Sequence, residues 1–287
     1  MKEYLIFRFK GEEILQILNE SEVHLLNDSD IYEGKIPVED ERFEILRRKW
    51  IKWYNRNSTF TISSNWIERT YSKEDFDNAK LFRIVPTKHL MVCGEECGTK
   101  YDYSKCCSEC NSGRVMVDSL KIKKSRAPKT GDWIHTYGGE ILVSRNFCTK
   151  SEEYGITGVT FKDTNVDYLY QPIIKETLEV SNNIVMNDLP LCPPLRKDFW
   201  NQLAKEYYRC PKCGTYLSTL QSEASVVNSS SIEKYDLFIS RQLFGVSRGY
   251  LYYEPLYFCS QKFRRMVETE KLKGIKFEVA HIVDPTL

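Results

Sequence analysis

Six cysteines stand in close pairs whose spacing could hold a metal ion. Cys93 and Cys97 form a C-x3-C pair, and Cys107 and Cys110 follow as a C-x2-C pair after nine intervening residues. Two such pairs on facing tight turns can supply four thiolates in a tetrahedron, as in a zinc ribbon. Thiolate ligands also select zinc over hard cations. The spacing therefore predicts a structural zinc site at Cys93, Cys97, Cys107 and Cys110.

A second knuckle, Cys210-Pro-Lys-Cys213, has the C-x2-C spacing but no partner pair after it. Such a pair can bind an ion or can serve only as a tight turn. Three completions stay open: Cys192 with Cys259 or His281, ligation shared with the first cluster, or a knuckle that binds nothing. We expect one structural zinc ion and leave a second open.

No catalytic arrangement accompanies the cysteines. Four thiolate ligands leave no open position for water or substrate, whether Cys106 or its neighbour Cys107 is the ligand. The four histidines show no H-E-x-x-H or similar spacing, and no phosphate-binding loop or nucleophile elbow occurs. Ser144 and Ser260 could be nucleophiles, but each precedes a predicted helix, where a serine N-cap is expected. We predict no catalytic residues and no enzymatic activity.

An internal repeat organises the second part of the chain. Residues 141–161 match residues 257–277 without a gap, at an offset of 116. The match aligns Ser144 with Ser260 at the predicted helix starts and aligns glycine with glycine after those helices. Each copy reads as strand, helix, strand.

The spacing upstream of the match stays in step as well. Cys110 precedes Asp132 by 22 residues, and Cys213 precedes Asp236 by 23. This agreement predicts a duplication in which a cysteine knuckle leads each copy. The fold class that follows is α+β, with a mixed or antiparallel sheet rather than a doubly wound one.

The N-terminal part reads as a strand, a loop and a helix. Residues 3–9 predict a strand, and EEILQIL after Gly11 predicts a short helix. The acidic stretch Glu20–Glu41 is rich in turn residues and predicts a loop. Residues 43–54 predict an amphipathic helix. Its apolar face comprises Phe43, Leu46, Trp50 and Trp53.

A further helix follows, because Ser72 and Asp75 have the spacing of a capping box. We place the N-terminal strand and helix region at 1–85, the first zinc-ribbon repeat at 86–180 and the second cysteine-knuckle repeat at 190–287.

Composition limits the setting and the partners. With 41 basic and 40 acidic residues, the chain has no overall field that would attract nucleic acid or an anionic membrane. Its first apolar run is too short for a signal peptide, and no run reaches the roughly 18 residues of a membrane span. Paired cysteines without a leader favour metal in a reducing compartment. We expect a soluble, cytoplasmic protein.

Three stretches could contact a partner. The basic run Lys121–Lys129 could touch phosphate, although a solvated loop is the simpler reading in a neutral protein. The acidic stretch Glu20–Glu41 could steer a basic partner. An insertion in the second repeat, SRQLFGVSRGYLYYEP, predicts a hairpin rich in Tyr and Arg, which are enriched at interface hot spots. The residues that we assign to partner contact are Glu33, Asp40, Arg248, Tyr250, Tyr252 and Tyr253.

Several motifs together resemble one bacterial protein family. They are Cys93-x3-Cys97-Gly98, Cys210-Pro-Lys-Cys213-Gly214, Asp132-Trp133, GGEILVSRNF, YGITGVTF and LYFCSQKF…LKGIKFEVAHIV. The set resembles the double-CXXCG immunity proteins of the SitI type, over most of the chain. The first motif has one residue more than the CXXCG pattern.

The resemblance implies a non-enzymatic antitoxin of bacterial competition. Such a protein binds a cognate toxin effector in a producing or sibling cell and blocks it, and its zinc is structural. The alternative, suggested by the ribbon spacing and the basic run, is a zinc-ribbon protein that binds nucleic acid or has a regulatory role. The sequence predicts neither the toxin nor the oligomeric state.

Overall fold

The computed structural model shows an α+β fold built mainly of strands, which confirms the predicted class. The chain divides into two compact units: among the described residues the first ends at Asp77 and the second begins at Asn78. Within these residues no helix is long and apolar enough to cross a membrane. The structure describes residues 1–10, 15–26, 31–43, 45–46, 61–90, 92–181, 209–217, 220, 222–245 and 252–284.

The first unit is an antiparallel sheet of order β2-β3-β1-β4. Phe7 and Phe9 alternate along β1 and are almost fully buried, and Ile36 and Leu46 pack against them. Each such side chain contributes about 1.5–3 kcal/mol on burial. The elements are β1 (Lys2–Lys10), η1 (Glu20–Glu22), β2 (Val23–Leu25), β3 (Tyr32–Pro37), β4 (Thr61–Thr70) and α2 (Lys73–Asn78).

The expected capping box at the start of α2 is confirmed. The backbone amide of Asp75 donates to Ser72 Oγ at 3.1 Å, and the amide of Ser72 donates to Asp75 Oδ2 at 2.8 Å. These reciprocal bonds satisfy two backbone donors that a helix start leaves without intrahelical partners.

Two N-terminal predictions are wrong. The acidic stretch contains β2 and β3 instead of a loop, and residues 15–17 of the predicted short helix form a turn. In β3, Gly34 and Ile36 face the core while Glu33 and Lys35 are on the other face, so charged residues conceal an alternating strand pattern. Most of the helix expected over 43–54, with Trp50 and Trp53, lies outside the described residues.

The second unit contains two large sheets, of orders β11-β12-β10-β9-β6 and β13-β15-β16-β5-β17-β14. The first comprises β6 (His89–Leu90), β9 (Trp133–Thr136), β10 (Ile141–Ser144), β11 (Val159–Asp163) and β12 (Leu169–Ile174). The second comprises β5 (Leu81–Pro86), β13 (Thr177–Leu178), β14 (Ala224–Val227), β15 (Leu237–Phe244), β16 (Glu254–Ser260) and β17 (Ile275–Val283). The remaining elements are η2 (Gly94–Cys97), β7 (Tyr101–Asp102), β8 (Val115–Met116), η3 (Lys124–Arg126), α3 (Arg145–Glu153) and α5 (Gln261–Thr269).

The second unit has two halves whose main strands follow one another, and pair with one another, in the same order. We name residues 81–163 the first half and residues 169–283 the second half. Leaving aside η2, β7, β8, η3 and β14, each half has a strand and a short strand before the knuckle, and two antiparallel strands, a helix and a strand after it. The short strands β6 and β13 pair in parallel with β9 and β15, at equivalent positions.

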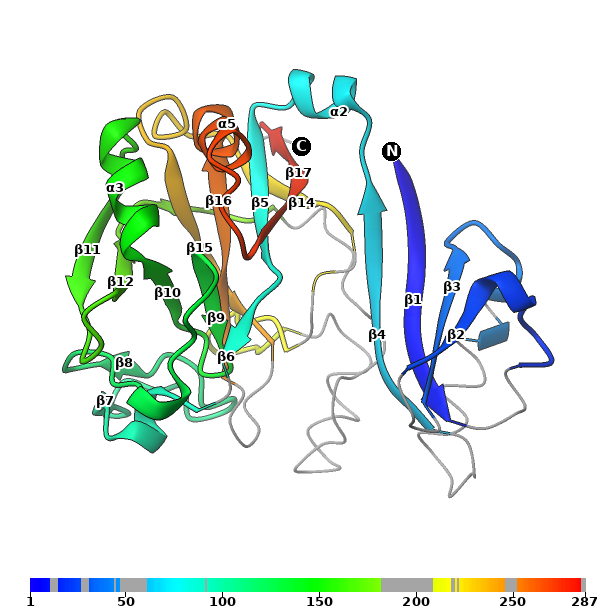
Figure 1. Cartoon of the computed structure of the whole chain (residues 1–287), viewed down its shortest axis with the longest axis horizontal. Helices are drawn as coiled ribbons and strands as arrows, with labels where there is room; N and C mark the ends of the chain where they lie inside the picture. Colours follow the sequence, from blue (N-terminus) through cyan, green and yellow to red (C-terminus); the bar gives the residue numbers. More distant parts are fainter. Residues whose placement is uncertain are drawn as a thin grey trace. The chain divides into compact units, whose positions relative to one another are not determined.

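Each half places its first strand in the sheet of the other half. β5 lies antiparallel between β16 and β17, and β12 lies antiparallel between β10 and β11 (Figure 1). The register is the same in both, because Leu81 pairs with Ser260 and Leu169 pairs with Ser144. The boundary predicted after residue 85 would separate β5 from this unit, whereas the observed boundary lies before β5.

The predicted serine caps are confirmed at both nine-residue helices. Ser144 Oγ accepts from the amide of Phe147 at 3.1 Å, and Ser260 Oγ accepts from the amide of Phe263 at 3.2 Å. The helices are neighbours, since the rings of Phe147 and Phe263 lie 5.9 Å apart. Each cap contributes roughly 1 kcal/mol.

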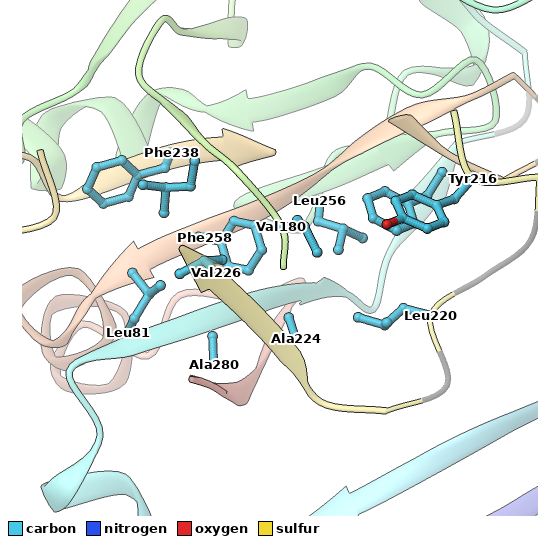
Figure 2. Packing of buried hydrophobic residues seen from close by; sticks show 12 residues of the cluster. Leu81, Val180, Tyr216, Leu220, Ala224, Val226, Phe238, Leu256, Phe258 and Ala280 are labelled. Atoms are coloured by element: carbon cyan, nitrogen blue, oxygen red, sulfur yellow. The ribbon is translucent and has the colours of Figure 1, made fainter. Parts of the chain in front are cut away.

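The core of the six-stranded sheet extends to the second cysteine knuckle. Figure 2 shows Val180, Val226, Leu256 and Phe258 among its buried side chains. Tyr216, three residues after Cys213, stacks on Phe244 with ring centroids 4.7 Å apart. Packing of Tyr216 therefore fixes the chain that leaves the knuckle.

Candidate metal centre

The two C-x2-C knuckles have the same backbone hydrogen bonds. In the first, between β7 and β8, the amide of Cys107 donates to the carbonyl of Ser112 at 2.8 Å. In the second, the amide of Cys210 donates to the carbonyl of Thr215 at 2.8 Å. Gly214 follows the second knuckle at φ 74°, in the left-handed region that glycine enters at little cost. Both loops thus turn their cysteines in the same way.

Four sulfurs from these knuckles meet in one group. Cys107 Sγ lies 3.7 Å from Cys210 Sγ, and Cys110 Sγ lies 3.5 Å from Cys213 Sγ. All four sulfurs lie within 4.8 Å of one another, and none is in a disulfide. A tetrahedral zinc site with Zn–S bonds of about 2.3 Å has sulfurs about 3.8 Å apart. The group therefore fits a divalent soft cation at its centre.

The ligand set differs from the predicted one in its first pair. Cys93 and Cys97 do not belong to the four-sulfur group; Cys210 and Cys213 take their place. Cys93 is buried, and its backbone forms an isolated antiparallel β-bridge with Ile122. Burial raises the pKa of its thiol to about 12. Cys97 ends the short helix η2.

Shared ligation was one of the completions left open for the second knuckle, and the geometry matches it. The other candidates lie elsewhere: Cys259 is fully buried in β16, and His281 Nε2 contacts Glu223 at 2.6 Å. Cys192 lies outside the described residues. Cys106 does not join the group, so Cys107 is the member of that adjacent pair that faces the other sulfurs.

Two hydroxyls adjoin the sulfurs. Ser112 Oγ lies 3.2 Å from Cys110 Sγ and 3.4 Å from Cys213 Sγ, and Thr215 Oγ1 lies 3.2 Å from Cys213 Sγ. The hydroxyls also contact each other at 2.8 Å. Sequence reasoning missed them, although each stands two residues after the second cysteine of its knuckle.

The thiols differ in their tendency to ionise. Burial is the main cause that raises the pKa of Cys110 and of Cys210 above the usual thiol value. Burial also opposes ionisation of Cys213, but hydrogen bonds from Ser112 and Thr215 outweigh it and lower the pKa to about 6. Full deprotonation of the group therefore needs additional positive charge, which a divalent cation supplies.

Positively charged side chains line a surface cavity beside the sulfurs. Lys105, Arg209 and Lys212 line the same surface cavity as Cys107 and Cys213. Lys212 Nζ also donates to Ser108 Oγ at 2.6 Å, which links the second knuckle to the first. Because four thiolates and one divalent cation carry a net charge of about −2, these cations offset it.

The acidic residues assigned to partner contact have partners within the first unit. Glu33 accepts from Arg8 at 3.0 Å and lies 3.4 Å from His24 Nε2. Asp40 accepts from Arg42, whose hydrogen bonds hold the pKa of this carboxyl at about 2. A basic partner would have to compete with these cations.

The tyrosines assigned to the hairpin adjoin the second unit's own side chains. The guanidinium carbon Cζ of Arg114 lies 3.3 Å from the ring centroid of Tyr252, and the Tyr252 hydroxyl donates to Glu95 Oε2 at 3.1 Å. Tyr253 is half-buried. Arg248 and Tyr250 lie outside the described residues, although the flanking strands β15 and β16 pair as the expected hairpin requires.

Lys121 of the basic run has partners, whereas Lys123, Lys124, Arg126 and Lys129 are exposed. Lys121 Nζ lies 3.1 Å from Asp118 Oδ2 and donates to the carbonyl of Gly98 at 2.7 Å. Lys124 and Arg126 belong to the short helix η3.

Comparison with known proteins identifies no relative, because no family model, curated protein or solved structure matches the chain.

Proposed function

We propose that this chain is an immunity protein that binds a protein toxin, and that a structural zinc ion at Cys107, Cys110, Cys210 and Cys213 joins its two knuckles. The observation that carries the zinc part is the meeting of four sulfurs at tetrahedral spacing. The resemblance of the two cysteine motifs to double-CXXCG immunity proteins supports the toxin-binding part.

The donor set favours a structural role for the ion. Four protein sulfurs fill a tetrahedral coordination sphere and leave no position for water or substrate. The ion would connect residues 103 positions apart in the chain, since each knuckle provides two ligands. Its contribution is to hold the two halves of the second unit in register.

Toxin binding would use surface residues of either unit. Glu33 and Asp40 stay candidates for a basic partner, which would replace Arg8 or Arg42 at their carboxylates. Tyr252 and Tyr253, with Arg248 and Tyr250, stay candidates on the second unit because aromatic and arginine side chains often anchor interfaces.

The direct experiment is co-purification with the product of a toxin gene adjacent to the gene for this chain. We expect a stable complex and growth protection when both are produced in one cell. A zinc-replete protein that neither binds nor protects against that toxin would overturn the immunity role. Salt-dependent binding to nucleic acid, lost on neutralising Lys121–Lys129, would establish the alternative instead.

A further inference from the structure

A pair of hydroxyls lies between the two cysteine knuckles. Ser112 and Thr215 occupy equivalent positions, each two residues after the last cysteine of its knuckle. Both residues are at least 95 % buried, and their side-chain oxygens lie 2.8 Å apart. A buried hydroxyl without a hydrogen-bond partner costs roughly 1–3 kcal/mol. The groups that these two hydroxyls contact therefore decide whether burying them is tolerated.

The two hydroxyls contact two of the four sulfurs, those of Cys110 and Cys213. Cys110 Sγ contacts Ser112 Oγ, and Cys213 Sγ contacts both Ser112 Oγ and Thr215 Oγ1. Among the described residues, no hydroxyl contacts the sulfur of Cys107 or Cys210, which lie 3.7 Å from each other.

Counting protons shows which sulfur the pair serves. A metal-bound thiolate only accepts hydrogen bonds, and each hydroxyl has a single proton to donate. One proton joins the two hydroxyls, which leaves one for a sulfur. If Ser112 donates to Thr215, Thr215 donates to Cys213. If Thr215 donates to Ser112, Ser112 donates to Cys110 or Cys213. Only Cys213 can receive the bond in both arrangements.

Cys213 is also the exposed member of the four cysteines. A solvent-exposed thiolate is the ligand that water, protons or a competing chelator reach first. A hydrogen bond from a buried hydroxyl stabilises the thiolate and holds its sulfur toward the metal, as outer-sphere partners do at other metal sites.

From these contacts we propose that Ser112 and Thr215 are positioning residues of the metal centre, holding the thiolate of Cys213 on the ion and thereby slowing metal release. This inference rests on the zinc centre proposed above. It concerns the hydroxyl groups themselves, not the volume or burial of the two side chains.

The test compares metal retention in full-length variants. Thr215→Val removes one hydroxyl at nearly constant shape, the double variant Ser112→Ala/Thr215→Val removes both, and Thr215→Ser keeps both. Ser108→Ala is the matched control, because Ser108 lies in the first knuckle and accepts from Lys212. The measurements are zinc affinity and release rate against a chromophoric chelator, with cobalt substitution to monitor the thiolate-to-metal absorption band.

We expect the double variant Ser112→Ala/Thr215→Val, which leaves no hydroxyl proton for Cys213, to weaken zinc binding about 10–100-fold and to speed release, with a changed cobalt band. Thr215→Ser and Ser108→Ala should stay within about threefold of the parent protein, because outer-sphere hydrogen bonds are kept. If the double variant does not fold, Thr215→Val carries the test, with a smaller expected loss, because Ser112 then divides its one proton between Cys110 and Cys213. Unchanged affinity and release in the hydroxyl-free variants, or an equal loss in Thr215→Ser, would overturn the inference. Absence of zinc binding by the parent protein would overturn the zinc centre as well.

Discussion

Asp132 and Asp236 occupy equivalent positions in the two halves of the second unit and make equivalent hydrogen bonds. One bond is within the aspartate's own half and the other is to the opposite half. Each carboxylate accepts from the capping serine of its half, at 2.7 Å from Ser144 and 2.6 Å from Ser260. Each also accepts from a backbone amide of the opposite half, that of Lys273 or Thr157. The two aspartates therefore join the helix start of one half to the turn of the other.

This reciprocity explains how the exchanged strands are kept in register. The turns that the aspartates bind precede β11 and β17, the strands that pair with β12 and β5. A shift of either turn would break both a carboxylate bond and a strand pairing. The hydrogen bonds and the sheet thus stabilise the same arrangement.

Asp236→Asn should reduce stability in a pH-dependent way. Burial opposes ionisation of Asp236, but bonds from Ser260 and Thr157 and the charge of Lys262 lower its pKa overall. A lowered pKa in the folded state gives stability that is present above the unfolded value of about 3.9 and is lost as pH falls through the folded value.

Urea unfolding at pH 7 should show Asp236→Asn less stable than the parent by about 1–3 kcal/mol, with a smaller difference near pH 3. Asp163→Asn at the exposed end of β11 is the control and should change stability little. A difference between parent and Asp236→Asn that stays constant over this pH range would contradict the role assigned to the carboxylate.

Gly274→Ala should be more destabilising than other glycine substitutions. Gly274 has φ 102°, and an added Cβ would overlap the backbone carbonyl of Trp133 and not the end of a flexible side chain. Gly155 is the matched control, with φ 58° and only the flexible Lys262 Nζ near the added atom, at 3.8 Å.

Thermal unfolding should distinguish the two glycine variants. Gly155→Ala carries the left-handed strain alone, about 1–2 kcal/mol. Gly274→Ala adds overpacking of about 1–3 kcal/mol. Equal losses of stability would show that the turn before β17 can move away from Trp133.

The sequence predicted local features well because their causes are local. Both serine caps, the box at Ser72 and Asp75, and the strand at residues 3–9 depend on neighbouring residues. The strand exchange depends on positions far apart. The segments of β5–β6 and β12–β13 align LFRIVPTKHL with LYQPIIKETL, which share only their first and last leucines. Burial requires apolar residues at certain positions of these strands but does not specify which apolar residue stands there. The two segments therefore show little sequence identity.

Of the four ligands predicted for one site, Cys107 and Cys110 belong to the four-sulfur group and Cys93 and Cys97 do not. The reason is again that the correct set joins positions far apart in the sequence. Cys93 and Cys97 precede Cys107 at a spacing that could complete a ribbon within one segment. A better signal was present, since Cys107 and Cys110 recur as Cys210 and Cys213 with the same internal spacing. Choosing between the two sets requires the fold, because it brings the halves together.

Substitution of single cysteines should separate ligands from bystanders. Cys107→Ser and Cys213→Ser should each abolish stoichiometric zinc, because three thiolates with one hydroxyl make a much weaker site. Cys97→Ser and Cys106→Ser should retain about one ion per chain, since neither sulfur joins the group. Elemental analysis of purified protein provides the measurement. Zinc lost from Cys97→Ser but kept in Cys213→Ser would restore the ribbon predicted from sequence.

Removal of the metal should loosen both knuckles together. Because each knuckle supplies two ligands, a chelator should expose backbone amides in both at once. The amides of Cys107 and Cys210, which donate within their loops, should lose protection in hydrogen exchange. The first unit is the internal control, since its core of Phe7, Phe9 and Ile36 contains no metal ligand. If only one knuckle loses protection, or if the first unit opens equally, the ion does not join the two halves.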